Sequence, residues 1–97
     1  MTIRLPSTLG VVQVAEYRAE LLSALEAGGD LELDARGVEE IDVAGLQLLE
    51  AAHRSAIGRG LRLSFTEGGR GAIEAVAKVV GLRLSETPTL WREVEHG

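Results

Sequence analysis

The chain has 97 residues, of which 45% are hydrophobic and 26% charged, with a net charge of −5 and no cysteine. This length and composition predict one folded domain over residues 1–97 and exclude a disordered chain. The basic residues are scattered, which argues against nucleic acid as a partner because phosphate backbones require clustered lysine and arginine. Disulfides and cysteine-based zinc sites are excluded.

The N-terminus lacks the basic and apolar regions of a signal peptide, and no stretch approaches the ~20 apolar residues of a membrane span. We therefore expect a cytoplasmic protein that does not insert directly into a membrane.

The first part of the chain predicts short extended segments followed by a helix. Thr2–Leu5 alternates polar and apolar residues, as a strand does, and Leu9–Val12 is interpreted as a second short strand or as the approach to the helix. Apolar residues recur at helical spacing over Val14–Leu25, and Gly28-Gly29 ends this helix because glycine adopts left-handed backbone conformations freely.

Leu31–Asp34 and Leu61–Phe65 alternate strictly and predict strands with one apolar and one polar face. Strands covered on both faces are apolar throughout, so we expect helices mainly on one face of the sheet. A helix over Val43–Ile57 joins the two strands, which predicts a right-handed parallel crossover.

The last part of the chain predicts a helix over Arg70–Val80, with Ile73, Val76, Ala77 and Val80 on its inner face. Leu82–Leu84 is interpreted as a short edge strand. Thr87-Pro88 predicts the start of a final helix, anchored to the core by Leu90, Trp91 and Val94. The expected fold class is α/β, with a small mixed β-sheet of four to five strands and helices mainly on one face.

The helix over Val43–Ile57 presents two apolar stripes. The first is the expected core face, formed by Gly45, Leu46, Leu49, Ala52, His53, Ala56 and Ile57. The second lies nearly opposite and consists of Ala44, Leu48, Ala51 and Ser55, while Gln47, Glu50 and Arg54 form a polar side between the stripes. A partner surface explains the second stripe; alternatively, Leu48 packs against the C-terminal helix or the loop before it. The solvent accessibility of Leu48 decides between the two.

The start of this helix has a chemistry of its own. Asp42 is a good N-cap because its carboxylate accepts hydrogen bonds from the free amides of the first turn. Gly45, three residues later, permits close approach of a neighbouring backbone. A helix N-terminus also favours anions, but Glu39 and Glu40 disfavour a free phosphate there.

Catalytic and cofactor motifs are missing from the sequence. Gly68–Gly71 matches neither a P-loop nor the dinucleotide-binding fingerprint, and turn formation explains its glycines. His53 and His96 have no second ligand at metal spacing, and no serine lies in a Gly-x-Ser-x-Gly motif. Helix caps and strand-end turns explain Asp34 and Asp42. We therefore expect no enzymatic activity, no metal and no cofactor.

The segment Leu31–Leu49, with the Asp42-Val43-Ala44-Gly45-Leu46 core, resembles the central signature of STAS domains, the anti-sigma-factor antagonists and their relatives. The likeness extends over about residues 14 to 84 and is greatest to the small MlaB-like branch. It implies a small mixed sheet with helices largely on one face. It also implies protein binding at this helix start, where Asp42, Gly45 and Leu46 match the family pattern. Together with the second stripe, the expected partner-binding residues are Asp42, Val43, Ala44, Gly45, Leu48 and Ala51. Val43 occupies the position where antagonists offer a hydroxyl for phosphorylation, and valine has none.

Three functions remain open from the sequence. The first is a regulatory, antagonist-like module in bacterial signalling that binds an anti-sigma, kinase-like or chemotaxis protein without the usual phosphorylated Ser/Thr. The second is a constitutive MlaB-like subunit that docks on the ATPase of a lipid-transport ABC system. The third is a small-ligand or nucleotide-binding domain.

Overall fold

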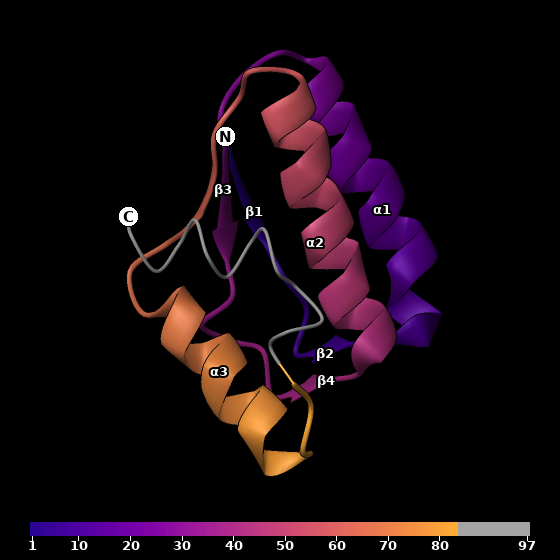
Figure 1. Cartoon of the computed structure of the whole chain (residues 1–97), viewed down its shortest axis with the longest axis vertical. Coiled ribbons are helices and arrows are strands. Elements are labelled where there is room, and N and C mark those ends of the chain that lie inside the picture. The colour runs from indigo at the N-terminus through magenta and orange to yellow at the C-terminus, as the bar shows by residue number, and fades with distance from the viewer. Residues whose placement is uncertain (84–97) are drawn as a thin grey trace.

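The structure is a computed structural model that describes residues 1–83. Its strands form two small parallel sheets (Figure 1). In the larger sheet, β3 (Leu31–Asp34) lies between β1 (Thr2–Arg4) and β5 (Leu63–Phe65). In the smaller one, β2 (Thr8–Leu9) pairs with β4 (Glu40–Ile41).

The helices are α1 (Val11–Glu26), α2 (Val43–Gly58) and α3 (Gly69–Val79). Figure 1 shows α1 and α2 side by side on one side of β1 and β3, with α3 near β4. α1 ends at Glu26 with Ala27 as its C-cap, and Gly28 follows with a φ of 87°. The predicted helix stop is therefore confirmed, because that positive φ suits glycine and strains other residues.

The core lies between the larger sheet and the paired helices. Its largest fully buried side chains are Leu5, Leu9, Leu21, Leu25, Leu31, Leu33, Leu46, Leu49 and Ile73. The opposite face of the sheet is polar: Glu32 is exposed on β3 and accepts a hydrogen bond from the Thr2 hydroxyl at 3.1 Å. Because apolar and polar residues alternate in this way, the expectation of helices mainly on one face is confirmed.

The α/β class and the strand number are confirmed, and three details differ from expectation. All strand pairs described within residues 1–83 are parallel, where we expected a mixed sheet. β4 was not predicted, because two residues that include a glutamate give no alternation to detect. Leu82 and Arg83 are not in a strand, and Leu84 and the predicted final helix at Thr87–Val94 lie outside the described residues.

α3 begins and ends within one residue of the prediction, but Val80 was wrongly placed on its inner face. Ile73 and Ala77 are buried, whereas Val80 follows the last helical residue and is 57% exposed. No helix among residues 1–83 combines the length and apolar character needed to cross a membrane.

Candidate functional site

The small β2–β4 sheet brings the starts of α1 and α2 together. Leu9 pairs with Ile41 in this sheet, and each strand leads into a helix two residues later. Because the two strands are parallel, both helices begin at the same end of the molecule and run in the same general direction (Figure 1). The exposed residues Val11, Val12 and Val43, together with the half-buried Ala44, form what we call the helix-start surface.

Asp42 joins the two helices by capping both. Its Oδ1 accepts a hydrogen bond from the backbone N–H of Gly45 in α2, at 2.9 Å, which confirms the predicted N-cap. Its Oδ2 accepts from the N–H of Val11, the first residue of α1, at 3.0 Å. One carboxylate therefore satisfies an unpaired amide of each helix start and opposes the positive end of both helix dipoles.

Gly45 fits this arrangement because it has no side chain. A Cβ built on Gly45 would overlap the carbonyl oxygen of Leu9 and lie 2.9 Å from Cγ1 of Ile41. The first turn of α2 thus packs directly against the backbone of β2, as the sequence predicted. Gly10 is similarly close, with Oδ2 of Asp42 at 2.9 Å from the place of its missing Cβ.

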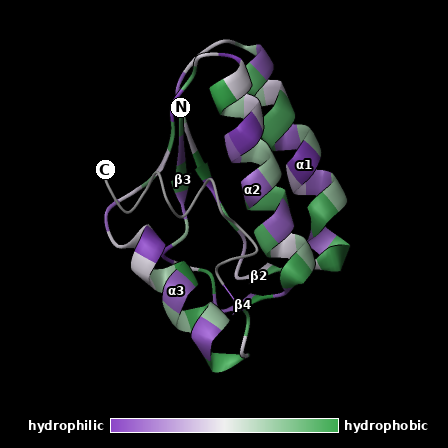
Figure 2. Ribbon diagram, in the orientation of Figure 1, coloured by the Kyte–Doolittle hydropathy of each residue, from purple (hydrophilic) through white to green (hydrophobic). Residues whose placement is uncertain are grey.

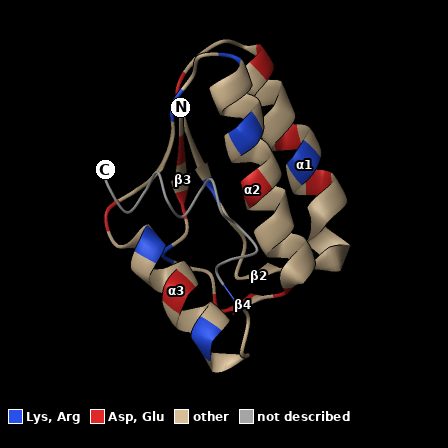
Figure 3. Ribbon diagram, viewed as in Figure 1, with Lys and Arg blue, Asp and Glu red and all other residues tan. Residues whose placement is uncertain are grey.

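The helix-start surface is apolar and uncharged. Val12 is 82% exposed, Val11 71% and Val43 40%. Neither α1 nor α2 has an acidic residue in its first turn, although such residues favour helix starts. Figure 2 shows hydrophobic residues at both helix starts, and Figure 3 shows no charge on the first turns. Apolar side chains are less stable in water than when buried, so this exposed apolar surface is a candidate contact site.

Leu48 does not belong to an exposed partner surface, contrary to the prediction. It is only 7% exposed, and α1 packs along this side of α2. The C-terminal helix that we considered as an alternative lies outside the described residues. Leu48 instead lines a groove of about 360 Å³ between the helices, together with Ala44, Ala51, Leu21 and Leu25. Ala51 is exposed and Ala44 half-buried, so these two remain accessible from the groove.

Two other residues of α2 differ from the predicted stripes. Ile57 was assigned to the core face but is 51% exposed, whereas its neighbour Ala56 in the same turn is fully buried. Glu50 was assigned to the polar side but is buried, and its carboxylate accepts a hydrogen bond from Nε of Arg54 at 2.7 Å. This pair, four residues apart, keeps the buried charge neutralised.

Asp34, at the end of β3, has a different environment from Asp42. Its two carboxylate oxygens each accept a hydrogen bond from the Arg36 guanidinium at 3.0 Å, and Oδ1 also accepts from the Arg36 amide at 3.2 Å. These bonds, with the positive charges of Arg36 and Arg4, lower the pKa of Asp34 to about 2. A carboxylate with so low a pKa is a poor general base. Its hydrogen bonds to Arg36 instead hold the start of the β3–β4 connection in place.

The structure brings Asp42, Val43, Ala44 and Gly45 together at one helix start, and places Leu48 and Ala51 further along the adjoining groove. Sequence reasoning missed Val11 and Val12, which complete the surface from α1. The signal was present: both valines precede the apolar residues at helical spacing and lie off the core face. Within residues 1–83, no cluster of His, Cys, Asp or Glu side chains is arranged to hold a metal ion.

The chain matches, over residues 1–84, the family described as "Mlab, STAS domain". It belongs to this family. STAS domains of this kind generally mediate protein–protein interactions and are generally binding modules without catalysis. No curated protein matches the chain.

Among solved structures, the chain is similar to one titled "The overall structure of SLC26A9", with a TM-score of 0.53 and 16% identity. The match covers 89% of this chain but only 17% of that one. At this identity the likeness supports the STAS fold alone.

Proposed function

We propose that this STAS domain is a constitutive protein-binding subunit that docks through the helix-start surface. The observation that carries the proposal is the group of exposed valines Val11, Val12 and Val43 around two helix starts that Asp42 holds side by side. Burying one valine side chain at an interface is worth about 1.5–3 kcal/mol at most, so three neighbouring valines supply a centre for binding.

The absence of a hydroxyl at residue 43 supports constitutive binding. STAS antagonists are switched by a phosphate at this position, where about two negative charges would be added beside Asp42. Val43 cannot carry that group, so the partner contact is not switched there. A partner that stays assembled with the domain suits this chemistry better than a partner released by a kinase.

The partner class we favour is the ATPase of a lipid-transport ABC system, because the matching family is the MlaB group. A regulatory role, with an anti-sigma, kinase-like or chemotaxis protein as partner, is the second candidate. It is supported by the antagonist-like helix start at Ile41–Leu46, and it requires regulation elsewhere than at Val43. Both partner classes place the domain in the cytoplasm and neither requires catalysis.

Small-ligand binding is the third candidate and rests on the groove between α1 and α2. Its volume of about 360 Å³ is near the lower end of ligand sites, and Leu21, Leu25 and Leu48 make it largely apolar. Arg18, Gln47 and Ser55 are the polar residues in its lining, which gives it few groups to orient a small ligand, so we rank this candidate below protein binding.

Substitution of the valines tests the proposal. The tagged full chain is purified from its native cells as wild type, Val12→Asp and Val43→Asp, with Ala19→Asp on the exposed part of α1 as the matched control. We expect both valine variants to lose the co-purifying partner by about tenfold or more, a loss of about 1.4 kcal/mol, because a charge replaces buried apolar contact. The control retains the partner.

Mass spectrometry of the retained partner separates the candidates: a transporter ATPase supports the first, and a signalling kinase or anti-sigma factor supports the second. Circular dichroism should show unchanged folding in all three variants, because these positions are exposed. Full partner retention by both valine variants would contradict the proposal, and a nucleotide or lipid that remains on the pure wild-type protein would favour the third candidate.

A further inference from the structure

A second apolar groove lies between α3 and the small β2–β4 sheet. It has a volume of about 550 Å³, and its apolar lining consists of Leu9, Ile41, Ala75, Val76, Val79 and Val80. Val79 is 85% exposed and Val80 57%, so their side chains are not covered by residues 1–83. The groove also includes Gly10 and Asp42, which places it directly beside the helix-start surface.

The charges around this groove are all of one sign. Glu39, Glu40 and Asp42 line it, and no basic residue does among residues 1–83. Asp42 is occupied by the two helix caps, but the exposed carboxylates of Glu39 and Glu40 form no salt bridge within residues 1–83. The acidic residues at β4 are visible in Figure 3.

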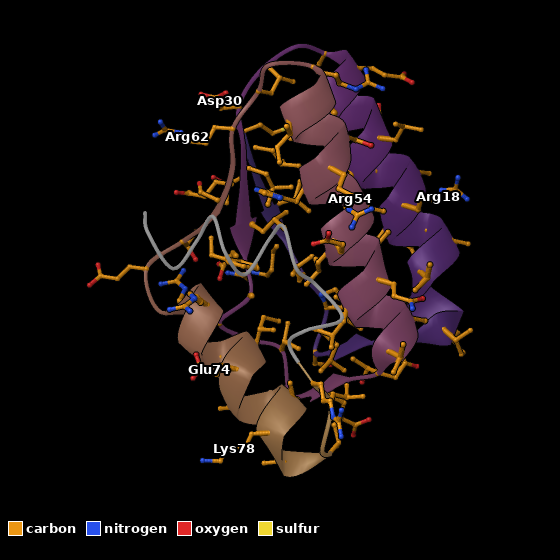
Figure 4. The ribbon with its side chains drawn as sticks, in the orientation of Figure 1. Arg18, Asp30, Arg54, Arg62, Glu74 and Lys78 are labelled. Carbon is orange, nitrogen blue, oxygen red and sulfur yellow. The ribbon has the colours of Figure 1, made fainter. Side chains whose placement is uncertain are left out.

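The backbone holds these two glutamates in place. The N–H groups of Glu39 and Glu40 both donate to the carbonyl oxygen of Ser7, at 2.7 and 2.9 Å. Lys78 of α3 does not line the groove, and Figure 4 shows Lys78 and Glu74 on the side of α3 that faces away from the other helices. The backbone of this acidic edge is therefore held in position, and its exposed carboxylates are available to a positive partner.

We propose that this groove receives a basic, apolar segment of the partner protein, in which Leu, Ile, Val or Phe side chains are flanked by Lys or Arg. The apolar side chains fill the space over Ile41, Val76 and Val79, and the flanking cations pair with Glu39 and Glu40. This proposal rests on the proposed function, since one partner protein would supply this segment and also bind the helix-start surface. The acidic edge also repels acidic segments, which makes the groove selective.

The test uses the ¹⁵N-labelled full chain and three synthetic peptides of equal length, in which Leu alternates with Lys, Gln or Glu. We expect the Lys peptide to shift the amide resonances of residues 39–42 and 75–80, the Gln peptide to do so more weakly, and the Glu peptide not to bind. Because the glutamates are exposed, added salt should weaken the Lys peptide's binding.

Two double variants with the same net charge separate local recognition from overall attraction to an acidic protein. Glu39→Lys/Glu40→Lys should weaken the Lys peptide by about tenfold, whereas Glu20→Lys/Glu26→Lys on α1 should change its affinity by less than about twofold. Val79→Ser should also weaken binding, because it removes apolar contact without adding charge.

In the peptide experiments, four results would overturn the proposal: equal binding of the Glu peptide, shifts outside the groove, equal weakening by the two double variants, or occupation of the groove without peptide. Occupation would be seen as concentration-dependent shifts from a second copy, or as nuclear Overhauser contacts between residues 84–97 and Val76. If Glu39→Lys/Glu40→Lys keeps full affinity for the native partner while Val43→Asp loses it, the groove proposal fails and the proposed function stands.

Discussion

Asp34 and Asp42 both stand at the carboxyl end of a short parallel strand, yet their surroundings differ completely. The carboxylate of Asp34 accepts hydrogen bonds from the Arg36 guanidinium and the Arg36 amide, and also from the Thr66 hydroxyl at 3.5 Å. Among residues 1–83 the carboxylate of Asp42 forms no salt bridge, and it accepts from the backbone amides of two separate helices.

This difference determines what each aspartate does for the molecule. Asp34 has its charge neutralised locally and fixes one loop. Asp42 joins two helices, and thereby places valines of both helices next to each other in an exposed position. Because the Asp42 carboxylate accepts its hydrogen bonds from backbone amides, the neighbouring side chains remain available for contact. The Asp42 end is therefore the better candidate for partner binding.

The largest effect in this comparison is expected for Gly45, which lets the first turn of α2 pack directly against the backbone of β2. Gly45→Ala should lower the free energy of unfolding by about 3 kcal/mol, because the added methyl group overlaps the Leu9 carbonyl and the backbone must move. Urea denaturation monitored by circular dichroism measures this.

Gly71→Ala is the matched control, because nothing lies within 4 Å of its added Cβ and the site is helical. Replacing a helical glycine there should raise the free energy of unfolding by roughly 0.5–1 kcal/mol. If Gly45→Ala were as stable as the wild type, the tight contact between α2 and β2 would be disproved.

A smaller effect is expected for the double cap. Asp42→Ala removes both hydrogen bonds and should cost about 2 kcal/mol, since a lost N-cap typically costs ~1 kcal/mol and two helices are affected. Asn is as good an N-cap as Asp but has only one acceptor oxygen, so Asp42→Asn should restore about half of this loss.

Hydrogen exchange of the Val11 and Gly45 amides identifies which helix start is released in Asp42→Asn. We expect one of the two amides to exchange faster and the other to remain protected. Protection of both amides in Asp42→Asn would show that a single oxygen is sufficient to cap both helices. The double cap by two oxygens would then stabilise the fold less than we infer.

The sequence alone was sufficient to predict most elements that depend on local pattern. The alternation in Leu31–Asp34, the apolar spacing in α2 and the Asp42 cap each involve neighbours along the chain, and their predicted bounds agree with the structure. Gly45 was interpreted correctly for the same reason, since a glycine three residues after a cap lies at the helix start.

The sequence failed where the environment depends on packing between distant segments. Leu48 and Ile57 were exchanged between core and surface because the position of α1 along α2 cannot be deduced from the helical spacing of α2 alone. The proximity of Val11 and Val12 to Val43 depends on the pairing of β2 with β4, and β4 has too few residues to show periodicity in the sequence. The partner-binding role of these residues remains a prediction.

The smallest expected effect concerns the ion pair of Asp34 and gives the other half of the comparison. Its pKa in the folded chain is lowered to about 2 from its ordinary value of 3.8, first by the side-chain hydrogen bonds from Arg36. A lowered pKa means that the ionised form stabilises the fold. This contribution is fully present above about pH 4 and is lost as the pH falls toward about 2.

Arg36→Ala should therefore raise the pKa of Asp34 toward its ordinary value, whereas Arg4→Ala should raise it much less because Arg4 lies 3.9 Å away and makes only a charge interaction. Titration of the Asp34 carboxyl carbon by ¹³C NMR measures both midpoints. Because Arg36 is largely exposed, the change in stability at neutral pH should be small. Equal midpoints in wild type and Arg36→Ala would show that the guanidinium does not lower the pKa of Asp34. Asp34 and Asp42 would then no longer differ in having, or lacking, a stabilising cation.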